Sequence, residues 1–250
     1  MPLYATSTDA VLLITKELRK QLPSQENQIE DIFVEFFGPA IDELSIADRS
    51  AIANLCNEYN SKTGFFPVDQ TTLDYLHQTG REKHSLMVTK KYLENVGLLR
   101  NNQNNDNIAY DKVIEVYLPD IIVTISGPRK SKDKVELEQV PKDFQQSLSN
   151  GLTSSGIMNI DIDGQFHSIQ NGSVLMSSIA SSSNTSNPSV MLTAGVLAKK
   201  AVEAGLSVPK YVKRSLCPGS GVVTSYLQVS DCIILAKYET SCAINFIVLL

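Results

Sequence analysis

The order of predicted elements places this chain in the α/β class, with mostly parallel strands. From residue 172 to residue 228 the sequence predicts strand, loop, helix, strand, turn and helix in succession. A βαβα order implies a parallel sheet with right-handed crossovers. The chain is also 250 residues long and 42% hydrophobic, which is enough to bury a core as one large domain or two small ones.

The first predicted element is an amphipathic helix over residues 6–21. Thr6 and Asp9 have the spacing of a capping box, in which each side chain accepts a hydrogen bond from the backbone N–H of the other residue. Basic residues gather near the C-terminal end of the segment, where the helix dipole favours positive charge.

Further elements of the first half are marked by caps and by breakers. Gly80 and Gly97 follow two of the helices, as expected for left-handed C-terminal turns. The expected elements are a strand at 32–37, a helix opened by Ser45 and Asp48 that runs to about Tyr59, a strand end at 65–67, and helices near 69–79 and 84–96.

The middle of the chain is less regular. An Asn-rich run at 101–107 predicts a surface loop or a disordered linker. Alternation predicts a strand at 112–118, and a short apolar run predicts a buried strand at 120–125. A short helix is expected near 141–149, whereas residues 150–170 are turn-rich and predict no definite element.

The last third carries the βαβα pattern. A strand at 172–180 is followed by a polar loop, 181–187, and by Pro188, a favoured first helical residue. The elements that follow are a helix to about Ala204 that Gly205 stops, a strand at 208–214, and a helix from Pro218–Gly221 to about Gln228.

Composition narrows the functional classes. The formal net charge is −5, so bulk attraction to nucleic acid is not expected and any RNA contact needs a local patch. The four cysteines show no CxxC spacing, which favours a reducing compartment over a disulfide framework. The N-terminus predicts no signal peptide, and the apolar run at 244–250 is far shorter than the roughly 20 residues of a membrane span. The expectation is a cytoplasmic protein.

Two segments could bind an anion. The 181–187 loop joins the carboxyl end of a predicted strand to a helix N-terminus, where ligands of open α/β sheets bind and where free N–H groups favour anions. Residues 126–134, SGPRKSKDK, carry Arg129, Lys130, Lys132 and Lys134 and could clamp a phosphate. The alternatives are that the first loop only caps a helix and that the second is a solvated surface loop.

No catalytic or metal-binding constellation stands out. His77, His84 and His167 are scattered, and a break at Gly80 separates the first two. No Ser-His-Asp arrangement is evident, and Pro218–Gly221 fits neither a Walker motif nor a dinucleotide fingerprint.

Seven ordered segments nevertheless resemble one known family. The chain is similar to the aconitase family, in the branch of cytosolic aconitase and the iron regulatory proteins, over about residues 6 to 230. The matching segments are 6–19, 33–59, 65–69, 75–81, 126–135, 183–206 and 215–228.

The resemblance implies an incomplete aconitase-like fold of three α/β/α layers. It predicts one α/β subdomain at 1–118, a second at 119–230 that carries the cluster loop, and an unmatched tail at 231–250. The family's N-terminal histidine and aspartate residues, and the C-terminal domain with its serine base and arginines, have no counterpart in the matched segments. We therefore expect a truncated protein.

The resemblance also implies that the family's [4Fe–4S] cofactor is lost. In the family the loop reads S-C-T-N-T-S-N-P, and its cysteine is one of three cluster ligands. Ser182 occupies that cysteine position here, and an alcohol is a poor substitute for a thiolate. The other two ligands come from a C-x-x-C beyond Gln228, where Cys232 and Cys242 have the wrong spacing. No cluster and no catalytic residue are expected.

Five positions match functional residues of the family. Asn54 and Glu58 match an N-x-x-x-E pair that faces cluster and substrate, although Asn60-Ser61-Lys62 replaces the family's following Gly-Ala-Thr. Ser126, Lys134 and Asn184 match positions that contact an iron-responsive RNA hairpin.

The resemblance therefore supports three readings of function. The family activity is aconitate hydratase, a hydro-lyase acting on citrate and isocitrate, and we expect this chain to lack it. The main expectation is thus a truncated protein with neither this activity nor a cluster, which could be a non-functional or structural fragment. The alternatives are residual binding of an iron-responsive RNA hairpin and the family activity itself.

Overall fold

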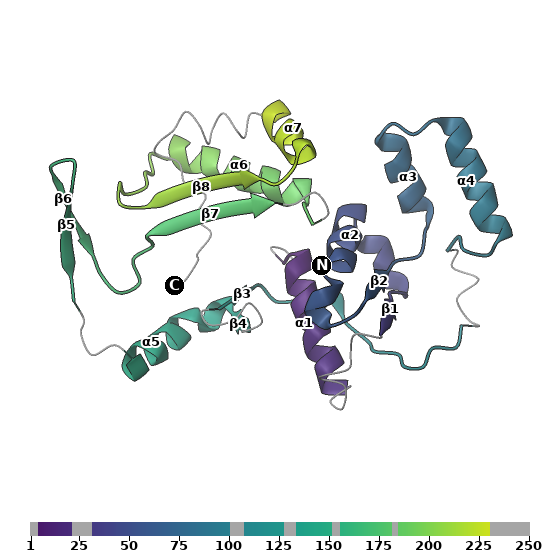
Figure 1. The fold of residues 1–250 in the computed structure, drawn as a ribbon, viewed down its shortest axis with the longest axis horizontal. Coiled ribbons are helices and arrows are strands. Elements are labelled where there is room, and N and C mark those ends of the chain that lie inside the picture. Colours follow the sequence, from purple (N-terminus) through teal and green to yellow (C-terminus); the bar gives the residue numbers. More distant parts are fainter. Residues whose placement is uncertain are drawn as a thin grey trace. The chain divides into compact units, whose positions relative to one another are not determined.

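The computed structural model describes residues 5–21, 32–100, 108–127, 134–151, 156–181 and 185–230. The chain forms two compact units, residues 1–123 and 124–250, which are described separately. Figure 1 shows the order of their elements. The subdomain division after residue 118 stays a prediction, and the tail at 231–250 lies outside the described residues.

The first unit begins with helix α1, Ser7–Gln21. The predicted capping box is confirmed: the Thr6 N–H donates to Asp9 Oδ2 at 2.8 Å, and the Asp9 N–H donates to Thr6 Oγ1 at 3.4 Å. Ala10 and Val11 on this helix are almost fully buried.

Two short strands follow, β1 (Phe33–Glu35) and β2 (Thr63–Phe65), and they pair in parallel. Between them lie the 3₁₀ helix η3 (Pro39–Glu43), the helix α2 (Ile46–Asn54) and the 3₁₀ helix η4 (Cys56–Tyr59).

The helix expected from Ser45 to about Tyr59 is thus two elements. Ser45 caps α2 as predicted, with its side chain accepting from the Asp48 N–H. The α-helix ends at Asn54, and the chain tightens into η4. Asn60 then reverses the chain in the left-handed conformation, with φ 55°. Asparagine tolerates this region better than most other residues with a side chain.

The core of the first unit joins α1 to α2 and η4. Tyr59 is 1% exposed, and its hydroxyl donates to the Ile52 carbonyl at 3.1 Å. Burial, followed by the charge of Cys56, raises the pKa of Tyr59. The buried members of the cluster are Ala10, Val11, Leu13, Ile14, Leu18, Leu44, Ile52, Tyr59 and Ile121.

Helices α3 (Gln70–Gln78) and α4 (Lys83–Asn95) form a helical hairpin. Asp69 caps α3 through a reciprocal capping box with Thr72. Gly80 and Gly97 follow the helices with φ 91° and 71°, as the sequence predicts.

The prediction of a strand at residues 112–118 is wrong. Residues 112–117 form no ladder, and the 3₁₀ helix η6 (Leu118–Asp120) follows. The alternation has another cause: Ile114, Val116 and Leu118 pack against the core while the residues between them are exposed. Period-two burial therefore arises here without backbone pairing.

The second unit starts with an antiparallel pair, β3 (Thr124–Ser126) and β4 (Lys134–Glu136). The strand predicted at 120–125 is therefore shorter and later than expected. The 3₁₀ helix η7 (Leu137–Gln139) and the helix α5 (Val140–Gly151) come next, and α5 confirms the helix expected near 141–149.

Residues 150–170, for which the sequence predicts no definite element, contain a hairpin. Strands β5 (Met158–Ile162) and β6 (Gln165–Ile169) pair antiparallel. Asp163 and Gly164 connect them with φ 53° and 79°. Two positive φ values at the centre of a two-residue loop are what a type I′ turn requires, and Asp-Gly is a favoured pair for it.

The βαβα order of the last third is confirmed. Strands β7 (Met176–Ser181) and β8 (Lys213–Pro218) pair in parallel, and helices α6 (Pro188–Glu203) and α7 (Gly221–Val229) follow them. The strand predicted at 208–214 was placed too early. A turn, in which the Val212 N–H donates to the Pro209 carbonyl at 3.0 Å, precedes the strand, and only residues 213 and 214 of the predicted segment belong to β8.

The α/β class is confirmed, but the parallel strands are fewer than expected. Among the described residues, β1–β2 and β7–β8 are parallel, whereas β3–β4 and β5–β6 are antiparallel hairpins. The three-layer arrangement remains a prediction.

Candidate functional site

The β3–β4 hairpin brings two predicted RNA positions together. Ser126 is the last residue of β3 and Lys134 the first residue of β4, and the two lie directly opposite in the antiparallel register. Opposite residues of an antiparallel pair have Cβ atoms about 5 Å apart on one face of the sheet. A hydroxyl and an ammonium group therefore start from one face at the end of the hairpin.

The surroundings of this pair leave it accessible. Ser126 is exposed and Lys134 is half-buried. Gly127 follows Ser126 with φ 126°, a backbone conformation that a residue with a side chain rarely adopts, so the chain turns away from β3 at once. Residues 128–133, which include Arg129, Lys130 and Lys132, lie outside the described residues.

The polar loop after β7 is described only at its end. Ser182 and Asn184 lie outside the described residues. Asn187 caps α6, with its Oδ1 accepting from the Ser189 N–H at 3.0 Å. Ser186 Oγ and the Tyr226 hydroxyl are 2.6 Å apart, which ties the loop to α7. Capping is thus one role of the loop, and anion binding stays a prediction.

Asn54 and Glu58 do not share one helix. Asn54 is exposed at the end of α2, and its Nδ2 donates to the Ser50 carbonyl at 2.7 Å. Glu58 is half-buried in η4, and its main-chain carbonyl accepts from Thr15 Oγ1 at 3.3 Å. The i, i+4 spacing therefore crosses a junction between two helix types, and the substrate role of both residues stays a prediction.

The altered stretch beside this pair has a structural role. Ser61 is 3% exposed, and its Oγ lies 2.7 Å from the Ile32 carbonyl and 2.8 Å from the Thr63 carbonyl. The serine hydroxyl therefore links the start of β2 to the residue before β1.

The histidines are as dispersed as the sequence suggests. His77 lies on α3 and His84 on α4, both exposed, while the ring of His167 on β6 meets Tyr211 edge-on at 5.7 Å between centroids. Within the described ranges, no group of three His, Cys, Asp or Glu residues could hold a metal ion.

Comparison with known proteins decides the family. The sequence model described as "Aconitase family (aconitate hydratase)" matches residues 1–235. The chain belongs to the aconitase family. The match includes residues 231–235, so it reaches past the end of the resemblance noted at about residue 230.

One relative lies in the branch that the sequence predicts. "Iron-responsive element-binding protein 2" of Xenopus tropicalis is 42% identical over 236 residues, which cover 90% of this chain and 24% of that protein. The chain thus spans about a quarter of the length of this aconitase-family relative.

The sequence at the loop after β7 bears on whether the family's iron–sulfur cluster could be held there, and the loss of the cluster stays a prediction. Thiolates hold such clusters, and the position after β7 that should supply one is Ser182. Cys217, near the carboxyl end of β8, is an exposed thiol whose Sγ is 3.3 Å from Ser215 Oγ. Among the described residues, Cys217 is the one thiol near this edge of the β7–β8 sheet, whereas a cubane cluster of this family needs three.

No helix in the described parts of the chain is long and apolar enough to cross a bilayer.

Proposed function

We propose that this chain is a cluster-free member of the aconitase family that binds an RNA hairpin through the end of its β3–β4 hairpin. The observation that supports the proposal is the direct pairing of Ser126 with Lys134. Both residues match RNA-contacting positions of the family, and the register places their side chains on one face.

The chemistry of this pair suits a nucleic-acid backbone. Lysine provides a mobile positive charge and three donors for phosphate oxygens, and serine both donates and accepts hydrogen bonds. The segment between the two residues adds Arg129, Lys130 and Lys132 against one acidic residue, Asp133. The name of the Xenopus relative, an iron-responsive element-binding protein, supports an RNA hairpin as the ligand class.

A gel-shift titration with an iron-responsive hairpin at a fixed salt concentration tests the proposal. Lys134→Gln should weaken binding several-fold, because one phosphate contact is lost, and Ser126→Ala should weaken it less. Lys210→Gln is the matched control, since Lys210 is an exposed lysine of the same unit that lies in the segment before β8. No shift at micromolar protein, or equal losses in Lys134→Gln and Lys210→Gln, would sink the proposal.

We further propose that the chain lacks aconitate hydratase activity. The hydro-lyase reaction of the family uses an open iron of the [4Fe–4S] cluster as a Lewis acid, and Ser182 removes one of the thiolates that would hold it. Anaerobic reconstitution with iron and sulfide should produce no cluster absorbance in this chain. A cluster band of full intensity would contradict the proposal.

The competing proposal is that the chain is a structural or inactive fragment. It predicts neither an RNA shift nor cluster absorbance, so the two experiments together separate it from the RNA-binding proposal. The cytoplasm is the compartment we propose, because free thiols such as Cys56 and Cys217 suit a reducing environment.

A further inference from the structure

The α3–α4 hairpin is attached to the first unit at a narrow stem. Asp69 precedes α3, and Arg100 lies a short distance beyond α4. Val68 and Leu99 form an isolated parallel bridge, and the Arg100 N–H donates to the Val68 carbonyl at 2.8 Å. The two ends of the segment from residue 70 to residue 99 therefore lie side by side.

Little apolar surface holds this hairpin to the rest of the unit. No residue between 70 and 99 belongs to the core cluster built by α1, α2 and η4. Leu73 of α3 is buried, but α4 has no buried residue. Val88 and Tyr92 on α4 are 54% and 63% exposed. Hydrophobic burial therefore stabilises the attachment weakly.

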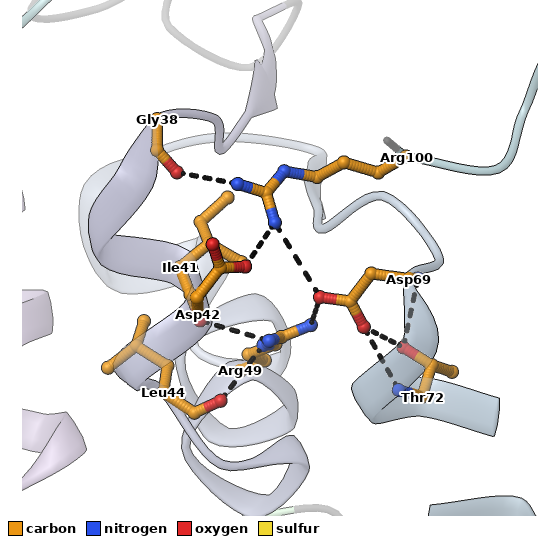
Figure 2. A network of polar contacts seen from close by, with 8 residues as sticks. All are labelled: Gly38, Ile41, Asp42, Leu44, Arg49, Asp69, Thr72 and Arg100. Carbon is orange, nitrogen blue, oxygen red and sulfur yellow. Dashed lines mark hydrogen bonds and ion pairs between the residues drawn. The ribbon is translucent and has the colours of Figure 1, made fainter. Parts of the chain in front are cut away.

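A buried network of charges closes the stem instead (Figure 2). Arg100 Nη1 binds the Asp42 carboxylate and lies 3.7 Å from Asp69 Oδ2, and its Nη2 donates to the Gly38 carbonyl at 3.0 Å. Arg49 Nη1 donates to the same Asp69 oxygen at 2.7 Å. The side chains of Arg100, Arg49 and Asp69 are 5%, 4% and 7% exposed, so water screens these charges little.

Arg100, just beyond α4, is the member of this network that links the C-terminal end of the hairpin to the rest of the first unit, here called its body. Asp42 and Gly38 lie in and beside η3, on the body side. Arg49 is held independently, because its Nε and Nη2 donate to the carbonyls of Leu44 at 3.1 Å and Ile41 at 2.9 Å. Loss of Arg100 would therefore leave the Arg49–Asp69 pair in place and release the end of α4.

We infer that Arg100 holds the C-terminal end of the α3–α4 hairpin against η3. We also infer that the hairpin unfolds locally, as one cooperative unit, while α1, α2 and η4 stay folded. Segments with few buried apolar contacts open at lower free energy than the core. A buried charge that loses its partner strongly destabilises the folded state. The attachment of the hairpin therefore depends on Arg100 keeping both its carboxylate and its carbonyl partners. This inference is independent of the RNA-binding proposal.

Native-state hydrogen exchange followed by mass spectrometry tests the inference on the full chain. In Arg100→Met the amides of residues 71–98 should exchange at least about tenfold faster than in the parent, while those of α1 and α2 keep their rates. Arg81→Met is the matched control, because Arg81 is an exposed arginine between the helices whose side chain donates only to the Thr79 carbonyl, at 3.3 Å, among the described contacts. It should leave the hairpin's rates unchanged.

Asp42→Asn keeps the test decisive if Arg100→Met does not fold. Asp42 is 52% exposed, so its loss leaves no buried charge isolated on the body side. It should accelerate exchange selectively in residues 71–98 by a smaller factor. Unchanged rates in that segment, or an equal acceleration across α1, α2 and the hairpin, would overturn the inference.

Discussion

At the scale of the residue, Gly64 shows how closely the first unit is packed. A Cβ atom at this position would lie 2.3 Å from the Tyr59 hydroxyl oxygen and 3.0 Å from the Ala53 Cα. The Tyr59 side chain is fixed by its own burial and by its bond to Ile52, so it cannot move aside without cost.

Gly64→Ala should therefore lower the free energy of unfolding by about 1–3 kcal/mol, the usual range for overpacking a core. Urea denaturation measures the change. Gly156→Ala is the control, since nothing lies within 4 Å of a Cβ there. Combining Gly64→Ala with Tyr59→Phe removes the nearest atom and should recover part of the loss; equal costs at positions 64 and 156 would refute the packing account.

Asp69 makes stability depend on pH. Burial opposes its ionisation, but hydrogen bonds from Thr72 and Arg49, together with the Arg49 charge, outweigh burial and lower its pKa below the usual 3.8. Because the folded pKa is below the unfolded one, the Asp69 contribution is complete above about pH 4 and is lost as pH falls through the lowered pKa.

Asp69→Asn should therefore lower stability at neutral pH and flatten the decline of stability below about pH 4. Denaturant unfolding at a series of pH values measures both effects. Asp74→Asn serves as the comparison, because Asp74 is exposed and its carboxylate accepts only from Gln70 Nε2, at 2.8 Å, among the described contacts. The two variants should differ in slope, and identical profiles would disprove the role of Asp69.

At the scale of the element, helix caps follow local chemistry. Ser220 opens α7, with its side-chain oxygen accepting from the Val223 N–H at 3.3 Å. Ser220→Ala should cost about 1 kcal/mol of stability, measured by thermal unfolding, because one N–H at the helix start loses its partner. Ser220→Asp keeps an acceptor in place and should restore most of the loss; if both variants lose stability equally, the cap is not the cause.

Elements defined by such local signals were predictable from the sequence. The capping residues Thr6 and Ser45 and the glycines at 80 and 97 mark helix ends in the structure where the sequence predicts them. These signals work because they satisfy backbone groups within one turn and need no distant partner.

Elements that depend on a distant partner were less predictable. The segment 112–118 alternates like a strand, yet its apolar side chains pack on a helical core instead of entering a ladder. The start of β8 was misplaced because its register is set by β7, more than thirty residues earlier, and not by its own sequence. For β5–β6 the Asp163-Gly164 pair is itself a local signal of a two-residue hairpin turn, so this hairpin is predictable from the sequence.

At the scale of the whole molecule, charge limits how RNA can bind. The chain carries a net charge of −5, so in our proposal the attraction to RNA comes from the basic segment at 126–134 and not from the molecule as a whole. The resemblance of the sequence to the family singles out Ser126 and Lys134 as candidate RNA contacts. Their position opposite each other is known only from the strand register in the structure.

RNA affinity should consequently depend only moderately on salt. With the basic residues of this segment as the phosphate contacts, the slope of log K against log salt concentration should be about −3, and Lys134→Gln should make it shallower by about 1. Filter binding across a salt series measures both slopes. A much steeper slope that Lys134→Gln leaves unchanged would mean that the RNA lies elsewhere on the chain.

The pairing of strands in twos has a practical consequence for anyone who purifies this chain. Among the described residues each sheet contains two strands, so each strand has one neighbour and an outer edge that meets no further strand. The edges of β7 and β8 are the longest, at six residues each. An outer edge offers amide and carbonyl groups to any extended peptide. We therefore expect concentrated samples to associate by sheet extension, and to do so first along β7 and β8.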